Sequence, residues 1–191
     1  MPLVSIFGQS GILRRFRRNQ SGLAAVEFAL IGPIFVALLL ATAEVSLRFY
    51  ADQVMETATA DAARAVLTGH AQNLDLPACP AANPGCSPAD RYKSHLCSQV
   101  PGGVLFDCNK FYVDIRSYQA FDQVQLDNHV DGTGAFVPNM QYNTGGPGDI
   151  VVVRVFYEWP TFINLLGFNL SNLANGKHLM VATAAFKNEP F

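Results

Sequence analysis

The residues of this chain whose type and spacing point most directly to covalent chemistry are its cysteines. They are Cys79, Cys86, Cys97 and Cys108. An even number of cysteines within one proline-bearing stretch, residues 70–109, is typical of disulfides formed in an oxidising compartment. The stretch has no C-x2-C pair and only His95 nearby, so it lacks the ligand spacing of structural zinc sites. We therefore expect two disulfides and no metal. Of the three possible connectivities, we favour Cys79 with Cys86 and Cys97 with Cys108, which close short loops.

Other side chains do not form a catalytic or ligand constellation. Residues 127–132 only partly match a calcium loop, because His129 replaces a ligand oxygen and Pro138 stands where the bidentate glutamate belongs. A solvated turn is the simpler interpretation, with a calcium contact through Asp127 and Asp131 left open. The glycine-rich residues 144–149 lack the Lys-Ser/Thr pair of a phosphate-binding loop, and no G-x-S-x-G or H-E-x-x-H motif occurs. We expect no enzyme, no catalytic residue and no cofactor.

A long apolar segment near the N-terminus dominates the hydropathy and charge pattern. Residues 28–43 carry no charge, and residues 23–26 extend this run across one acid, Glu27. Because about 20 helical residues cross a bilayer core, residues 23–43 are long enough to span it. Four arginines and no acid precede the run, so the positive-inside rule places residues 1–22 in the cytoplasm. We expect a single-pass protein whose body lies outside the cytoplasm.

The elements that position these residues follow from periodicity. The helical pattern continues to Thr68 without glycine or proline after Ala43, and Gly69 predicts its end. Pro33 lies inside the span and removes one backbone hydrogen bond, so we expect a local kink there. The second half of the helix is amphipathic. The apolar positions that recur at three- and four-residue steps, and that are expected to face a core, are Leu47, Tyr50, Val54, Ala58, Ala62 and Ala65, with Met55 and Val66 as further candidates.

Beyond the helix, the pattern predicts three strands, at residues 110–118, 149–159 and 177–187. Short helices are expected at residues 88–100 and 161–166. The fold class is therefore α+β: a long N-terminal helix, transmembrane in its first half, packed on a small antiparallel β-sheet head. We expect a basic cytoplasmic leader (1–22), a transmembrane and stalk helix (23–69) and an extracytoplasmic head (70–191). The body after the leader is net acidic, which argues against nucleic acid as a partner.

The sequence at the membrane edge carries a family resemblance. Gly22 follows the basic leader, and LAAVEF then places a carboxylate, Glu27, and an aromatic, Phe28, in an apolar helix. This pattern resembles a type IVb prepilin. The longer run AAVEFALIGPIFVALLLATAEV, with Pro33 and Glu44, is similar to the N-terminal motif of TadE-like pseudopilins of tight-adherence (Tad, or Flp) pilus systems. The closing AAFKNEPF is also similar to the ending seen in that family.

The resemblance implies a type IV pilin-like fold and a role as a minor subunit. A prepilin peptidase would cut between Gly22 and Leu23, and other pilins, pseudopilins and an inner-membrane assembly platform would be partners. Glu27, with Phe28 beside it, would then fix register by pairing with the new amino terminus of a neighbouring subunit; alternatively Glu27 snorkels to the headgroups. Glu44 is expected at the membrane interface or in a subunit contact. The implied location is a bacterial inner membrane with a periplasmic head, or the pilus itself.

Two other interpretations of the same segment stay open. Ala41-Thr42-Ala43 satisfies the small-x-small rule of a secretory signal, which would release a soluble protein beginning at Glu44. An uncleaved anchor would instead hold an extracytoplasmic binding module in the membrane. In either case the protein would have no pilus role, and a ligand would be expected on the loops at residues 119–148.

Overall fold

The computed structural model describes residues 22–73, 76, 85–100, 105–162 and 170–191. The chain divides into two compact units between Ala43 and Glu44, and the second is called the head unit here. One helix, α2 (Leu23–Leu67), contributes its first half to one unit and its second half to the head unit. The remaining elements are α3 (Pro88–Gln99), η2 (Cys108–Lys110), β1 (Phe111–Tyr118), η3 (Phe121–Gln123), β2 (Ile150–Pro160) and β3 (Lys177–Lys187).

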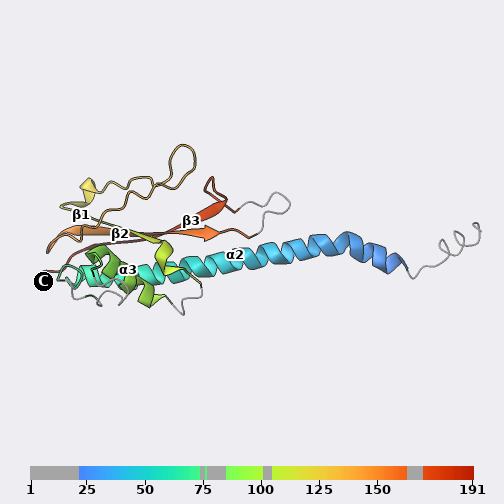
Figure 1. The fold of residues 1–191 in the computed structure, drawn as a ribbon, viewed down its shortest axis with the longest axis horizontal. Coiled ribbons are helices and arrows are strands. Elements are labelled where there is room, and N and C mark those ends of the chain that lie inside the picture. The colour runs from blue at the N-terminus through green and yellow to red at the C-terminus, as the bar shows by residue number, and fades with distance from the viewer. Residues whose placement is uncertain (1–21, 74–75, 77–84, 101–104, 163–169) are drawn as a thin grey trace, which may run out of the picture. The chain divides into compact units, whose positions relative to one another are not determined.

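The strands form one antiparallel sheet in the order β1-β2-β3 (Figure 1). This confirms the α+β prediction of a long N-terminal helix with a small antiparallel sheet. The alternating and β-branched runs marked the strands well: β3 has the predicted bounds, and β1 and β2 each begin one residue later than predicted. The short helix predicted at residues 161–166 falls mostly on residues 163–169, which lie outside the described residues.

One face of the sheet packs against the second half of α2 and against α3 (Figure 1). Within the head unit, the buried positions of α2 are Glu44, Ala51, Met55, Ala58, Thr59, Ala62, Ala63, Ala65 and Val66. The prediction that Leu47 and Tyr50 face this core is wrong, because they are 42% and 57% exposed. The other predicted positions pack in or against the core, which the helix enters mainly through small alanine side chains.

The other face of β1 and β2 is also covered, by the connection between these strands (Figure 1). The alternation in β1 is typical of a half-buried strand, with Asp114 on the solvent-facing side. Instead Asp114 is fully buried, and Phe156 of β2 packs there with Leu173 and Leu179. A hydrophobicity pattern detects apolar burial only, so it could not reveal that Asp114 and Arg154 are buried on this face as an ion pair.

The C-terminal residues secure the end of α2. Gly69 has a φ of +82°, as expected for a glycine that ends a helix. The amide of Glu189 donates to the carbonyl of Leu67 at 3.0 Å, which satisfies one of the last carbonyls of the helix. The Asn188 side chain donates to the carbonyls of Thr144 and Gly146. The closing NEPF sequence therefore joins the end of α2 to the turn before β2.

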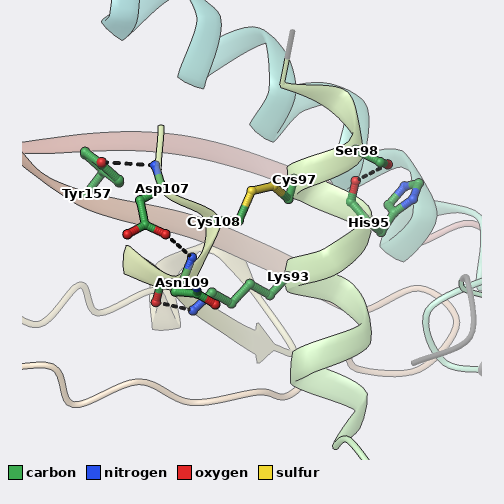
Figure 2. The surroundings of a disulfide bond; sticks show 8 residues. All are labelled: Lys93, His95, Cys97, Ser98, Asp107, Cys108, Asn109 and Tyr157. Carbon is green, nitrogen blue, oxygen red and sulfur yellow. Dashed lines mark hydrogen bonds between the residues drawn. A yellow bond between two sulfur atoms is a disulfide. The ribbon is translucent and has the colours of Figure 1, made fainter. Parts of the chain in front are cut away.

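A disulfide between Cys97 and Cys108 fastens α3 to η2 (Figure 2), as predicted. Lys93 adds a second link, because its ammonium donates to the carbonyl of Asn109 at 2.8 Å. Ser87 and Asp90 form a capping box at the start of α3. The second predicted pair, Cys79 with Cys86, stays a prediction. Cys86 is disulfide-bonded, but Cys79 lies outside the described residues.

Candidate functional site

The first half of α2 exposes almost all of its apolar side chains. Phe28 is 76% exposed, Leu30 69% and Ile31 66%. Within the described residues this helix is the one candidate for crossing a membrane by length and composition. So much apolar surface on one helix needs lipid or other helices to cover it. We therefore take this half of α2 as the candidate functional site.

The predicted processing junction coincides with the start of the helix. Leu23 is the first residue of α2, and Gly22 directly precedes it. A Cβ added at Gly22 would meet no described atom within 4 Å, and Leu23 is 63% exposed. Both residues of the predicted cleavage bond are therefore exposed.

The two predicted register residues, Glu27 and Phe28, lie in the first two turns of α2. Glu27 is exposed, and within the described residues it has no hydrogen bond or ion pair. A carboxylate on an otherwise apolar helix is costly in a bilayer unless it finds a cationic partner or reaches the headgroups. The chain thus presents one negative charge on this surface, close to the predicted new amino terminus.

Gly32 is a residue of this surface that the sequence analysis did not single out. A Cβ at Gly32 would lie 3.4 Å from the ring of Phe28, one turn earlier. The sequence signal for this contact is that Phe28 and Gly32 stand four residues apart and so share one face of a helix. Pro33 follows directly and lies inside α2 without ending the helix.

The comparison with protein families bears on this same segment. Residues 22–64 match the family model described as TadE-like protein. This segment is TadE-like. The TadE-like match begins at Gly22, so it includes the predicted junction, and it ends within α2 before the sheet. It confirms the family that the N-terminal motif suggested. Searches of the curated proteins and of the solved structures gave no match.

Glu44 belongs to the TadE-like segment and to the head unit. Its side chain is only 6% exposed, and its Oε1 accepts a hydrogen bond from the backbone amide of Phe162 at 2.9 Å. From its sequence, Glu44 is expected at the membrane interface or in a subunit contact. The structure gives it a partner in its own chain, in the residues that follow β2, and no sequence signal linked these two positions.

A cluster of charged residues lies on the outer face of the sheet. It includes Asp127 and His129, from the loop that partly matches a calcium site. Asp114 Oδ2 lies 2.6 Å from Arg154 Nη2, and Arg116 binds both Asp114 and Asp127. His129 Nε2 lies 3.0 Å from Arg154 Nη2, which can only donate, so this nitrogen accepts. Its Nδ1 must then carry the proton toward the carbonyl of Val137, 3.2 Å away. The loop is therefore tied to the sheet through the His129 ring.

The protonation of these acids agrees with a structural role. Burial raises the pKa of Asp114, but hydrogen bonds from the Gln141 amide, Arg154 and Arg116 outweigh burial and lower it. Arg116 also lowers the pKa of Asp127. Asp131 accepts from Thr133 and Ala135 in an exposed turn, which lowers its pKa too. The described residues hold no cluster of three or more His, Cys, Asp or Glu that could bind a metal.

The aromatic residues of β2 pack in the core, and the glycine-rich turn is held by a hydrogen bond. Trp159 and Tyr157 are buried and meet Phe106 edge to face, with ring centroids 5.8 and 5.0 Å away. In the turn at residues 144–149, Asp149 accepts from the Gly146 amide. Among the described residues outside α2, the charged cluster, the aromatic side chains and the glycine-rich turn therefore stabilise the fold.

Proposed function

We propose that this chain is a minor pilin-like subunit, a TadE-like pseudopilin, of a Tad/Flp type IVb pilus or a related secretion system. The TadE-like match at residues 22–64 carries the proposal. The TadE-like family consists of structural pilus components, so the proposed role is assembly without catalysis. The exposed apolar half of α2 supports it, because a pilin needs a helix that lipid covers before assembly and other helices cover afterwards.

In the proposed mechanism the chain inserts with its basic leader in the cytoplasm and its head in the periplasm. A prepilin peptidase then hydrolyses the bond between Gly22 and Leu23. The new Leu23 ammonium of one subunit meets the Glu27 carboxylate of its neighbour, which pairs two charges in an apolar surrounding and fixes the axial register. The partners are thus the peptidase, other pilins and pseudopilins, and the inner-membrane assembly platform. The proposed domains remain 1–22, 23–69 and 70–191.

The N-terminal residue of the protein purified from its native membranes tests this proposal. Edman degradation or intact mass should identify Leu23 as the first residue. A chain beginning at Glu44 would indicate a secretory signal and a soluble product, which contradicts the pilus role. An intact Met1 would contradict processing and favour an anchored binding module.

A charge-removing variant tests the assembly step separately. Glu27→Ala should leave cleavage intact but lower the amount of chain that co-purifies with other pilins, because the ammonium loses its counter-charge. Glu56→Ala is a matched control, since Glu56 is an exposed acid of the same helix within the head unit. Equal recovery of both variants with the pilins would reject the proposed register contact.

A further inference from the structure

Phe162 lies at the level of α2 where the proposed membrane span ends. Glu44 directly follows the apolar run, and its buried carboxylate holds the Phe162 amide at 2.9 Å. A second hydrogen bond fixes the neighbouring residue, because the Thr161 hydroxyl donates to the carbonyl of Gly176 at 2.6 Å. Phe162 is therefore tied to α2 on one side and to the start of β3 on the other.

The connection between β2 and β3 returns at this same end of the sheet. Pro160 is paired with Lys177, and His178 Nδ1 lies 2.8 Å from the carbonyl of Leu170. The described residues of this connection, 161–162 and 170–176, include no charged residue. Charged side chains are costly inside a bilayer, so none of these residues opposes contact with its surface.

The Phe162 side chain itself is 68% exposed. Two further aromatic residues, Phe49 and Tyr50 of α2, are 66% and 57% exposed and follow Glu44 by five and six residues. At 1.5 Å per residue they stand about 8 Å beyond Glu44, within the thickness of one headgroup layer. Exposed aromatic rings gathered at this depth are typical of the interfacial belt of membrane proteins.

We propose that the ring of Phe162 inserts into the interfacial region of the lipid bilayer, so that the head has a second membrane contact beside the spanning helix. Glu44 acts as the positioning residue by holding the Phe162 backbone at the end of the span. This inference rests on the proposed function, since it requires residues 23–43 to cross the membrane. It assigns the exposed ring to lipid and not to another protein.

The test uses a tryptophan at position 162 in the full chain, reconstituted alone into vesicles of phosphatidylethanolamine and phosphatidylglycerol. Trp159 is the only native tryptophan, so Trp159→Phe provides the background for Phe162→Trp. The indole at position 162 should emit at shorter wavelength than in water and should lose emission when the lipids are brominated near the headgroup. Carbonate extraction in parallel establishes whether α2 is inserted.

Phe121→Trp in the same background is the matched control, because Phe121 is 65% exposed but lies at the opposite end of the sheet. It follows β1, whose last residue pairs with Ile150 beside the end of α2 at Leu67. This is about 35 Å along α2 from Glu44, so brominated lipid should not quench the indole at position 121.

The outcomes separate this inference from the proposed function. An inserted chain whose position 162 is unquenched overturns the inference and leaves the spanning helix intact, whereas release by carbonate contradicts the span itself. A blue-shifted but unquenched indole at position 162 also overturns it, in favour of a second protein chain. Adding Glu44→Ala should reduce the quenching and Glu44→Gln should preserve it. Glutamine, unlike alanine, keeps a side-chain oxygen that can accept from the backbone amide of Phe162.

Discussion

Asp114 of β1 and Arg154 of β2 stand directly opposite each other in the sheet and form an ion pair away from solvent. Their side chains are 0% and 7% exposed. Arg154 also donates to the carbonyl of Asp127, so this one arginine joins both strands to the long connection between them. The pair thus links the connection at residues 119–148 to both strands.

Removing one partner of this pair should be costly. Asp114→Asn leaves Arg154 buried without a counter-charge, and such changes lower the free energy of unfolding by about 3–5 kcal/mol. Chemical denaturation of the full chain in detergent, followed by tryptophan fluorescence, measures the change. Asp107→Asn is the control, because its pair with Lys110 is 43% and 64% exposed and is worth at most about 1 kcal/mol. Equal effects of the two variants would contradict the buried role of Asp114.

The same carboxylate should make stability depend on acidity. The folded state lowers the pKa of Asp114 below its unfolded value of about 3.9, so this group stabilises the fold fully above that value. The contribution is lost as the pH falls through the folded pKa, because the unfolded chain binds the proton first. Thermal unfolding between neutral pH and pH about 3 should therefore show a smaller acid loss in Asp114→Asn than in the native chain. Parallel curves would reject this assignment.

Some of the fold followed from sequence because the signals are local. Gly69 and the alanine content predicted the end of α2, alternation and β-branched runs predicted the three strands, and the length of the uncharged apolar run predicted the span. The contacts of Asp114 with Arg154 and of Glu44 with Phe162 join positions far apart in the chain. A single sequence contains no periodicity that reports such pairs, so the closed outer face and the buried Glu44 were missed.

The end of α2 offers a test of steric fit. A Cβ at Gly69 would lie 2.5 Å from the Phe191 ring, and the φ of +82° is itself unfavourable to other residues. Gly69→Ala should lower the free energy of unfolding by more than the roughly 1–2 kcal/mol that left-handed backbone costs. Gly176→Ala is the control for that cost, because its φ is +76° and no described atom lies within 4 Å of its added Cβ.

A double variant isolates the contribution of the ring. In a Phe191→Ala background the alanine at position 69 meets no ring, so its effect should fall to that of Gly176→Ala. Denaturation curves of the four chains give the coupling between the two positions. Strict additivity would mean that the C-terminal ring does not pack on Gly69.

The disulfide between Cys97 and Cys108 should stabilise α3 locally. The two cysteines are 11 residues apart, and closing a loop of this length is worth about 3 kcal/mol in the chain-entropy model. In the double variant Cys97→Ala with Cys108→Ala, hydrogen exchange should accelerate at the amides of α3, which keeps only the Lys93 hydrogen bond as its link to η2 among the described contacts. Amides of β2 serve as the internal reference, because this strand is paired on both sides. Unchanged exchange in α3 would show that packing of Tyr92 and Leu96, and not the disulfide, holds this helix in place.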